Sequence, residues 1–270
     1  MCENRERLDV LLVKKGLFSS RERARESVLK GEIFVNGLKV MKCGKKIDVN
    51  SKIDFKGEKL KYVSRGGLKL EKAVEYYDIN LKNKVCFDIG ASKGGFTDCM
   101  LQNGASKVWA IDVGSNQLDD KLKKHEKVTS LEKTNVRYLE FKDIGQYGDF
   151  ASIDVSFISL EKIIPNVLEL LHENAELAAL IKPQFEAGKS KIGKHGVVKK
   201  PEIHVEVIER IIKFLKLHNL KIIGVTNSPI KGPEGNIEYL VYCTKDQNRE
   251  EKFSFSEIIP LVRNAHKGLK

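Results

Sequence analysis

The stretch FDIGASKGGFTD, residues 87–98, decides the fold. Its apolar start predicts a β-strand, its glycines predict a tight turn, and its last residues predict the start of a helix. In an open α/β sheet, a ligand binds beyond the carboxyl end of such a strand, where the next helix begins. Gly90, Gly94 and Gly95 would let the backbone lie against that ligand, because glycine has no Cβ.

Two carboxylates indicate which ligand the turn favours. The string GASKGG lacks the second glycine of the dinucleotide fingerprint, and Asp88 before it would repel a pyrophosphate. Asp112 ends the next apolar run, VWAIDV, and can accept hydrogen bonds from ribose hydroxyls, a feature that NAD enzymes share. Together these residues favour S-adenosylmethionine, a phosphate-free cation, over NAD or an empty structural turn. The expected cofactor-binding residues are Asp88, Gly90, Ser92, Gly94, Gly95, Phe96, Asp112 and Val113.

The chain on both sides of this turn alternates short apolar runs with helical patterns. Alternation of this kind predicts an α/β fold, a doubly wound sheet with helices on both faces. The last two apolar runs, LKIIGVTNSPI and IEYLVYC, are joined by a short connection and predict an antiparallel pair at one edge.

The first 60 residues follow a different pattern. RLDVLLVKKG predicts a short amphipathic helix that stops at Gly16. Ser19 or Ser20 can cap a second, basic helix, on which Ala24 and Val28 form an apolar stripe. IFVNGLKV places Asn-Gly between two β-prone runs and predicts a tight hairpin.

Composition limits the possible partners and compartments. The 270 residues carry a net charge of +11, which favours a polyanion such as nucleic acid, although solvated lysine-rich faces give the same count. No apolar run approaches the roughly 20 residues needed to span a bilayer, and the first residues lack a cleavage signal. The five cysteines are scattered without CxxC pairs, so we expect a cytoplasmic protein without a metal or membrane partner.

Four polar residues stand where apolar pattern alone would not place them: Lys69, Asp154, Lys182 and Glu238. Asp154 and Lys182 end predicted strands, which puts them at the ligand edge of the sheet. A charge at a strand end is often merely solvated, and spacing alone does not bring all four to one site.

The helix, basic helix and VNG hairpin of residues 5–60 resemble the S4 RNA-binding domain. The resemblance implies that the second helix faces RNA, with Arg21, Arg23, Arg25 and Lys30 as contacts; a solvated helix face is the alternative. Such side chains mostly neutralise phosphates and carry little sequence information.

The motifs VSRGGLKL, DIGASKGGFTD, AIDVG, DVSFISL, LIKPQFEAG and GVVKKPEIH are similar to those of the TlyA (haemolysin A) family. That family combines an S4 domain with a Rossmann-like, class I methyltransferase domain of the FtsJ/RrmJ type. The resemblance implies domains at residues 1–60 and 68–248, a linker at 61–67 with Arg65 as a further RNA contact, and a C-terminal segment at 249–270. Lys93 departs from the proline that this group often has before the glycine pair.

The resemblance also implies an activity. Members methylate cytidine 2′-hydroxyls in ribosomal RNA of the large subunit, and some also of the small one. They use S-adenosylmethionine and a Lys-Asp-Lys-Glu tetrad, which Lys69, Asp154, Lys182 and Glu238 match in order. A lysine acts as a base only when part of it is neutral, and burial or a second ammonium favours that form. We therefore expect Lys182 to be the base, Lys69 to lie beside it, and the carboxylates to orient both.

The segment KPQFEAGKSKIGKHGVVKKPEIH is rich in lysine and glycine. Lys189, Lys191 and Lys194, with Lys199 and Lys200, can grip an RNA backbone or simply form a solvated loop. We leave the lone His195 out of the catalytic set. Phe157 and Phe185 can stack on an unpaired base, with core packing the expectation for Phe157.

Three other functions remain open from sequence. A ribosome-associated RNA-binding factor without catalysis would keep the S4 domain but need no intact tetrad. A membrane-lytic toxin would need a secretion signal or a long amphipathic or apolar segment. An NAD-dependent oxidoreductase is disfavoured by Asp88 and by the absent GxGxxG.

Overall fold

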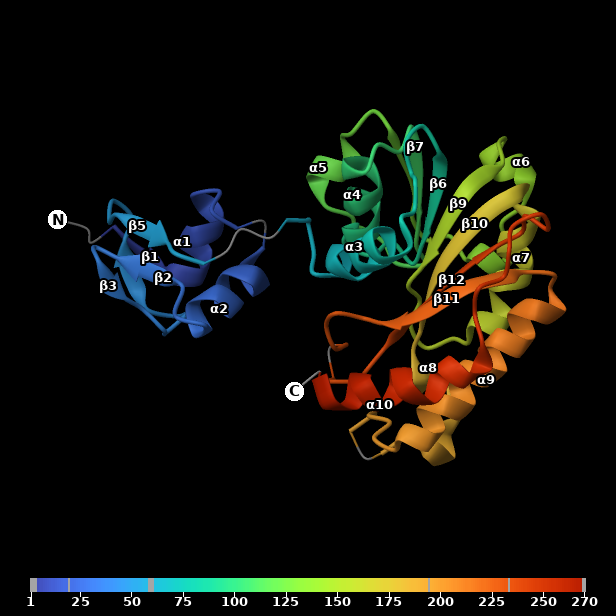
Figure 1. The fold of residues 1–270 in the computed structure, drawn as a ribbon. Helices are drawn as coiled ribbons and strands as arrows, with labels where there is room; N and C mark the ends of the chain where they lie inside the picture. The colour runs from blue at the N-terminus through green and yellow to red at the C-terminus, as the bar shows by residue number, and fades with distance from the viewer. Residues whose placement is uncertain (1–3, 19, 58–60, 194, 233, 269–270) are drawn as a thin grey trace. The chain divides into compact units, whose positions relative to one another are not determined.

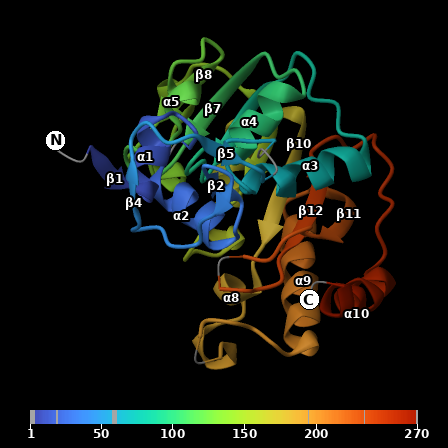
Figure 2. The same ribbon diagram turned by 90° about the vertical axis from the view of Figure 1, so that its left-hand side faces the viewer.

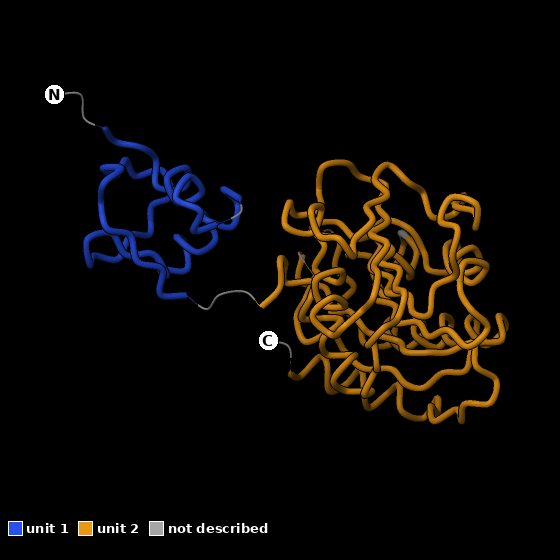
Figure 3. The backbone as a smooth tube through the Cα atoms, turned by 90° about the horizontal axis from the view of Figure 1, so that it is seen from above, with its two compact units in different colours: residues 1–60 blue, residues 61–270 orange. Residues whose placement is uncertain are grey.

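The computed structural model describes residues 4–18, 20–57, 61–193, 195–232 and 234–268. The chain divides into two compact units, residues 1–60 and 61–270, which are coloured separately in Figure 3. Each unit is described by itself.

The first unit is small and mixed α/β. Its elements are β1 (Arg5–Arg7), α1 (Leu8–Lys14), α2 (Arg21–Leu29), β2 (Ile33–Val35), β3 (Leu38–Lys39), β4 (Lys46–Asp48) and β5 (Ile53–Phe55). β1 pairs with β4, and β2 lies between β3 and β5. Ala24 and Val28 are fully buried, as their stripe on the second helix predicts.

The hairpin and one helix cap of this unit confirm the turn predictions. Val35 pairs with Leu38 across a turn in which Asn36 and Gly37 have φ angles of 49° and 81°. These left-handed values are the ones that a two-residue Asn-Gly turn requires. The Ser20 side chain accepts a hydrogen bond from the backbone of Arg23 and caps α2; Ser19 lies outside the described residues.

The second unit holds the large sheet. Its helices are α3 (Gly66–Tyr77), α4 (Gly95–Gln102), α5 (Asp120–Lys123), α6 (Phe141–Ile144), α7 (Ile164–Glu169), α8 (Pro183–Glu186), α9 (Pro201–Leu217) and α10 (Ile258–Gly268), with 3-10 turns at Val136–Tyr138, Leu160–Lys162, Lys189–Lys191 and Phe255–Glu257. Its strands are β6 (Val85–Ile89), β7 (Lys107–Ile111), β8 (Val128–Leu131), β9 (Gly148–Ile153), β10 (Leu171–Ile181), β11 (Lys221–Asn227) and β12 (Tyr239–Thr244).

The sheet has the order β11-β12-β10-β9-β6-β7-β8. The run from β10 to β8 is parallel throughout, whereas β12 is antiparallel to both of its neighbours. The predicted doubly wound sheet and its antiparallel edge pair are therefore confirmed. β8 was not predicted, because this edge strand is short and only half-buried and lacks an apolar run.

Helices cover both faces of the sheet (Figures 1 and 2). α3 and α4 pack on one face through residues such as Leu70 and Met100, and α7, α9 and α10 pack on the other through residues such as Ile164, Ile208 and Val262. The carboxyl ends of the five parallel strands meet at one edge, and that edge receives the side chains discussed below.

The stretch expected to be a linker packs against the second unit. Tyr62 is buried and lies so close to Gly67 that a Cβ there would be 2.3 Å from the ring. The backbone of Val63 donates a hydrogen bond to Asp98 on α4, and α3 begins at Gly66. Within the described residues, none of the helices combines the length and the apolar character needed to cross a membrane.

Candidate active site

Four residues from distant parts of the chain meet at the carboxyl edge of the sheet. Lys69 lies near the start of α3, Asp154 follows β9, and Lys182 follows β10. Glu238 directly precedes β12, and because β12 runs antiparallel to β10, its first residue reaches the same edge. Strand direction thus explains how residues far apart in sequence come together.

The four side chains form two linked ion pairs. Lys69 Nζ donates to Glu238 Oε2 at 2.6 Å and lies 3.8 Å from Asp154 Oδ2. Lys182 Nζ lies 2.5 Å from Asp154 Oδ1, off the direction of a hydrogen bond, so this contact is an ion pair. Asp154 therefore stands between two ammonium groups, and the two carboxylates balance the two lysines.

Burial distinguishes the members of this tetrad. The side chain of Glu238 is 1% exposed and that of Lys69 is 9% exposed, so their pair is closed to solvent. Lys182 is 8% and Asp154 20% exposed. The tetrad therefore opens toward solvent on the side of Asp154, where a substrate can approach.

Two further polar residues form hydrogen bonds with members of the tetrad, and the sequence analysis predicted neither. Lys182 Nζ donates to Ser156 Oγ at 3.2 Å, and Gln184 Nε2 donates to Glu238 Oε1 at 3.1 Å. Each lies two residues after a predicted catalytic residue, inside the motifs DVSFISL and LIKPQFEAG. That position was the only signal the sequence offered.

Phe157 does not pack in the core, so that expectation is wrong. Its side chain is 90% exposed, and its φ of 64° lies in the left-handed region that phenylalanine rarely adopts. Its ring lies 4.9 Å from that of Phe185, and Lys182 Nζ lies 5.8 Å from the Phe185 ring centre. β9 ends at Ile153, so the apolar run continues as a turn that projects this ring beside the tetrad.

The glycines of the turn are required first by the protein's own packing. A Cβ on Gly90, whose φ is 85°, would lie 2.4 Å from the carbonyl oxygen of Asp154. A Cβ on Gly94 would overlap Leu122 at 2.3 Å, and one on Gly95 would overlap the Ser64 hydroxyl at the same distance. Contact of these glycines with a ligand remains a prediction.

Asp88 points into the protein. Its carboxylate is fully buried and accepts hydrogen bonds from the backbone and hydroxyl of Thr97 at 2.8 and 2.6 Å. Burial raises the pKa of Asp88 to about 7, against the hydrogen bonds from Thr97 and Ser152, which favour the charged form. The neighbouring Phe96 is also buried. We therefore expect both residues to act on a cofactor through the shape of the turn.

Asp88→Asn should change how stability depends on pH. The pKa of Asp88 is higher in the folded than in the unfolded chain, so the folded state holds its proton more tightly. This contribution to the free energy of unfolding is complete at low pH and is lost as pH rises through about 7. Relative to the variant, the wild type's free energy of unfolding should fall by an amount on the order of 4 kcal/mol between pH 4 and 7. Denaturant unfolding followed by the fluorescence of Trp109, the one tryptophan, measures this; parallel curves would contradict it.

Asp112, the residue predicted to accept ribose hydroxyls, directly follows β7. Asp112 Oδ2 accepts from the backbone of Ser92, and Oδ1 accepts from that of Gly114, each at 2.7 Å. Ser92 has a left-handed φ of 48°, and Val113 is 70% exposed. A small cavity adjoins these residues; it is lined by Ala91, Ser92, Ala110, Asp112, Gly114, Gln117, Leu118, Ser130 and Glu132. A carboxylate beside an exposed aliphatic side chain is the pair of features that a nucleoside site uses; the cavity itself, of about 10 Å³, has room for no more than a water molecule.

Glu132, after β8, is a cavity residue that the sequence did not suggest. It accepts a hydrogen bond from the backbone of Asn116 at 2.8 Å and pairs with Lys123 at 3.0 Å. These contacts hold the pKa of Glu132 below its usual value. Among the described residues, no group of three or more His, Cys, Asp or Glu side chains is arranged to hold a metal.

The residues predicted to contact RNA are placed as follows. Arg21, Arg25 and Lys30 are exposed on the first unit, Arg23 is half-buried, and Arg65 is exposed before α3. Lys191 pairs with Glu206 at 2.6 Å. The side chain of Lys189 and all of Lys194 lie outside the described residues.

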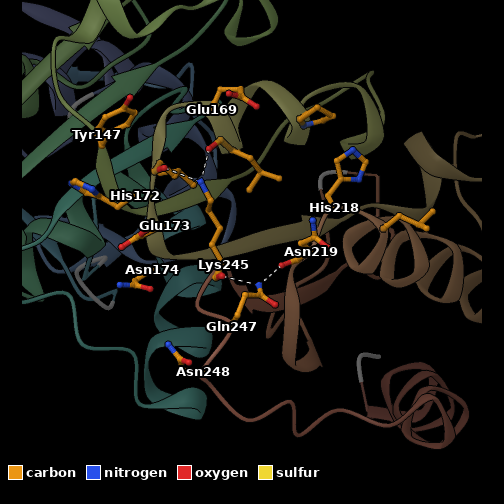
Figure 4. A pocket seen from close by; sticks show the side chains of 14 residues that line it. Tyr147, Glu169, His172, Glu173, Asn174, His218, Asn219, Lys245, Gln247 and Asn248 are labelled. Carbon is orange, nitrogen blue, oxygen red and sulfur yellow. Dashed lines mark hydrogen bonds between the residues drawn. The ribbon is translucent and has the colours of Figure 1, made fainter.

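A groove of about 1120 Å³ lies at the other end of the sheet (Figure 4). It borders the amino end of β10, whereas the tetrad borders the carboxyl end. Lys245 enters the groove and donates to the carbonyls of Leu168 and Leu171 at 2.8 Å each, and burial lowers its pKa. These bonds tie α7 and β10 to the end of β12, so this lysine is structural.

A doubly wound sheet with a glycine turn, a carboxylate after its second parallel strand and a polar tetrad, all at one edge, is typical of the class of Rossmann-like methyltransferases. The FtsJ-like methyltransferase family model matches residues 62–245, and the S4 domain model matches residues 6–53. The chain therefore belongs to the FtsJ-like methyltransferase family and carries an S4 domain.

Individual relatives match nearly the whole chain. YqxC of Bacillus subtilis (strain 168), named as a proposed rRNA methyltransferase, is 45% identical over an alignment of 273 positions that covers 100% of this chain and 97% of YqxC. TlyA of Mycobacterium tuberculosis (strain CDC 1551 / Oshkosh), a 16S/23S rRNA (cytidine-2′-O)-methyltransferase, is 35% identical and covers 91% of this chain and 92% of TlyA. The structure of a proposed hemolysin from Streptococcus thermophilus is 45% identical, with a TM-score of 0.78 over 98% of this chain and 97% of that one.

Proposed function

We propose that this protein transfers a methyl group from S-adenosylmethionine to the 2′-hydroxyl of a cytidine in ribosomal RNA. The observation that carries the proposal is the meeting of Lys69, Asp154, Lys182 and Glu238 at the edge of the sheet that holds the glycine turn. The curated name of the Mycobacterium tuberculosis relative supports the nucleotide and the RNA class.

Residues on two strand ends would hold the cofactor. Asp112 offers carboxylate oxygens for ribose hydroxyls, Val113 offers an exposed aliphatic surface for adenine, and the Ser92 turn borders both. S-adenosylmethionine supplies an electrophilic methyl group on a positively charged sulfur. Most of the rate gain then comes from holding donor and acceptor in line.

Lys182 is the proton acceptor in this proposal. A ribose hydroxyl loses its proton as its oxygen attacks, and a neutral amine can take that proton. In the structure Asp154 holds the Lys182 side chain, and Lys69 lies on the other oxygen of the same carboxylate. Asp154 and Ser156 fix the position of this amine, which can take the proton only in its neutral form. Glu238 and Gln184 in turn fix Lys69.

The exposed Phe157 supports a single-stranded target. RNA enzymes commonly stack an unstacked base on an aromatic ring, and such a base must leave its helix before its ribose can enter a site. The Phe157 and Phe185 rings lie together next to Lys182 and offer such a surface. The strained backbone of Phe157 is a conformation that proteins keep mainly at functional sites.

The first unit holds two arginines in one fixed arrangement. Asp9, fully buried, accepts from Arg7 Nε and Nη2 at 3.0 and 3.1 Å and from Arg21 Nη2 at 3.0 Å. The hydrogen bonds from Arg7 hold the pKa of Asp9 at about 2. Both arginine side chains remain at least half exposed, which leaves donors for phosphate oxygens. We infer that Arg7, which the sequence did not suggest, binds RNA together with Arg21.

Asp9→Asn should weaken RNA binding although it adds one positive charge to a net charge of +11. Charge alone predicts tighter binding. Loss of the fixed arginine geometry instead predicts an affinity about tenfold weaker and a smaller salt slope, which is the change in the logarithm of the binding constant with the logarithm of the salt concentration. Asp54→Asn on β5 makes the same charge change in the other sheet of the unit, which does not contain Arg7 or Arg21. Filter binding of both variants to ribosomal RNA decides; an Asp9→Asn protein that binds as tightly as Asp54→Asn refutes the arrangement.

The proposed activity is tested with tritiated S-adenosylmethionine and ribosomal RNA from cells that lack the gene, as free RNA and as subunits. The wild type should label at least one of these substrates. RNA that is bound without becoming labelled would favour the second candidate, an RNA-binding factor without catalysis. Calorimetric binding of NAD in preference to S-adenosylhomocysteine would remove the cofactor assignment.

A further inference from the structure

The loop between α8 and α9 is hydrogen-bonded to the segment that directly precedes Glu238 and β12. Asn236, which is 2% exposed, lies two residues before Glu238. Its Nδ2 donates to the carbonyl of Gly196 at 2.9 Å, and its Oδ1 accepts from the backbone of Val198 at 3.0 Å. A single amide side chain therefore binds the loop through both of its polar atoms.

His204 on α9 completes this attachment. Its Nε2 lies 2.8 Å from the Val198 carbonyl and its Nδ1 lies 2.9 Å from the Tyr239 hydroxyl. Burial lowers the pKa of His204 to about 4, so the ring is neutral at pH 7. Because the carbonyl can only accept, Nε2 carries the hydrogen and Nδ1 accepts from Tyr239. The backbone N–H of Val198 therefore donates to Asn236, and its carbonyl accepts from His204.

The same segment closes on the catalytic carboxylate. The backbone of Gly232 donates to the carbonyl of Asn236 at 2.9 Å. A Cβ on Gly232 would lie 2.6 Å from Glu238 Oε1, so the turn packs directly on that carboxylate. The loop, the turn and Glu238 therefore form one connected unit.

This loop carries exposed lysines beside a cavity. Lys199 and Lys200 are exposed and follow the held Val198 directly. A cavity of about 560 Å³ is lined by Ser190, Lys191, His195, Lys199, Lys200 and others of this loop. Lysines of this kind bind a nucleic-acid backbone through its phosphates, without base specificity.

We propose that Asn236 is a positioning residue, which holds Lys199 and Lys200 as an RNA-phosphate contact at a set place relative to Glu238. The proposal rests on the proposed function and adds a second RNA contact, within the methyltransferase unit. Asn236 and His204 together orient the loop, through their hydrogen bonds to Gly196 and Val198.

The test is a double-mutant cycle read by the Kd for ribosomal RNA and its salt slope. Asn236→Ala should weaken RNA binding about tenfold and reduce the salt slope by about 1 to 2, with S-adenosylhomocysteine affinity unchanged. In a Lys199→Ala/Lys200→Ala protein, Asn236→Ala should cause no further loss, because the two act through one contact. Asn166→Ala, which removes the two hydrogen bonds that the Asn166 amide on α7 donates to the carbonyls of Val136 and Leu139, is the matched control.

Two results overturn the proposal: an unchanged Kd and salt slope in Asn236→Ala, or the same loss with and without the two lysines. If Asn236→Ala does not fold, Asn236→Ser, which keeps one polar contact, enters the same cycle with the same criteria. Wild-type methyl transfer, measured in parallel, separates this result from the proposed function. If the wild type transfers no methyl group, the proposed function is wrong. If it does transfer but the effects of Asn236→Ala and of the two lysine substitutions are independent, only the positioning role is wrong.

Discussion

Lys182→Ala should reduce the rate of methyl transfer by about 10²–10⁴-fold while S-adenosylhomocysteine binds with nearly wild-type affinity. The side chain removed is the proposed proton acceptor, and it lies against Asp154 and Ser156, not against the residues expected to hold the nucleoside. Single-turnover transfer to ribosomal RNA and calorimetry measure the two quantities separately. Substantial residual activity would refute the assignment of Lys182 as base.

Lys182→Arg separates base chemistry from charge. Arginine keeps the positive charge and can pair with Asp154, but it does not deprotonate in proteins. We expect this variant to fold and bind RNA normally and to be as inactive as Lys182→Ala. An active Lys182→Arg enzyme would show that only the charge at this position matters.

Lys69→Met should destabilise the protein as well as inactivate it. The change leaves the buried carboxylate of Glu238 with only Gln184 as a side-chain donor, and an unpaired buried charge costs about 3–5 kcal/mol. Replacing both partners, as Lys69→Met with Glu238→Gln, removes that charge and should recover most of the stability. Denaturant unfolding measures the recovery.

Activity decides what this pair is for. In the proposed mechanism Lys69 also acts on Asp154, 3.8 Å away, so the double variant should stay inactive although it is stable. A stable double variant with wild-type transfer rates would show that the pair only supports the fold. The two readouts therefore distinguish a catalytic from a structural role.

The arrangement of the sheet was largely predictable from local pattern. β6 and β7 are buried on both faces, so apolar residues fill them apart from Asp88 in β6 and Lys107 at the start of β7. α9 shows a regular apolar stripe. β8 escaped prediction because an edge strand needs few apolar residues. Strand direction then explains why strand-end residues meet.

Side-chain direction was less predictable. The sequence placed Asp88 next to the ligand site, but not which way it points; its bonds to Thr97 depend on how α4 leaves the turn. Phe157 belongs to an apolar run, and only the end of β9 at Ile153 shows why it is exposed. Lys69 and Glu238 are 169 residues apart, and no local pattern joins them. Family resemblance supplied that pairing, and the structure supplies its geometry.

The most direct measurement identifies the atom that receives the methyl group. Ribosomal RNA labelled by the wild type with S-adenosylmethionine is digested to nucleosides, which are separated and identified by mass spectrometry, beside a Lys182→Ala reaction. The account predicts that the label is in 2′-O-methylcytidine and is lost in the variant. Label on a base atom, or equal label with the variant, would contradict it.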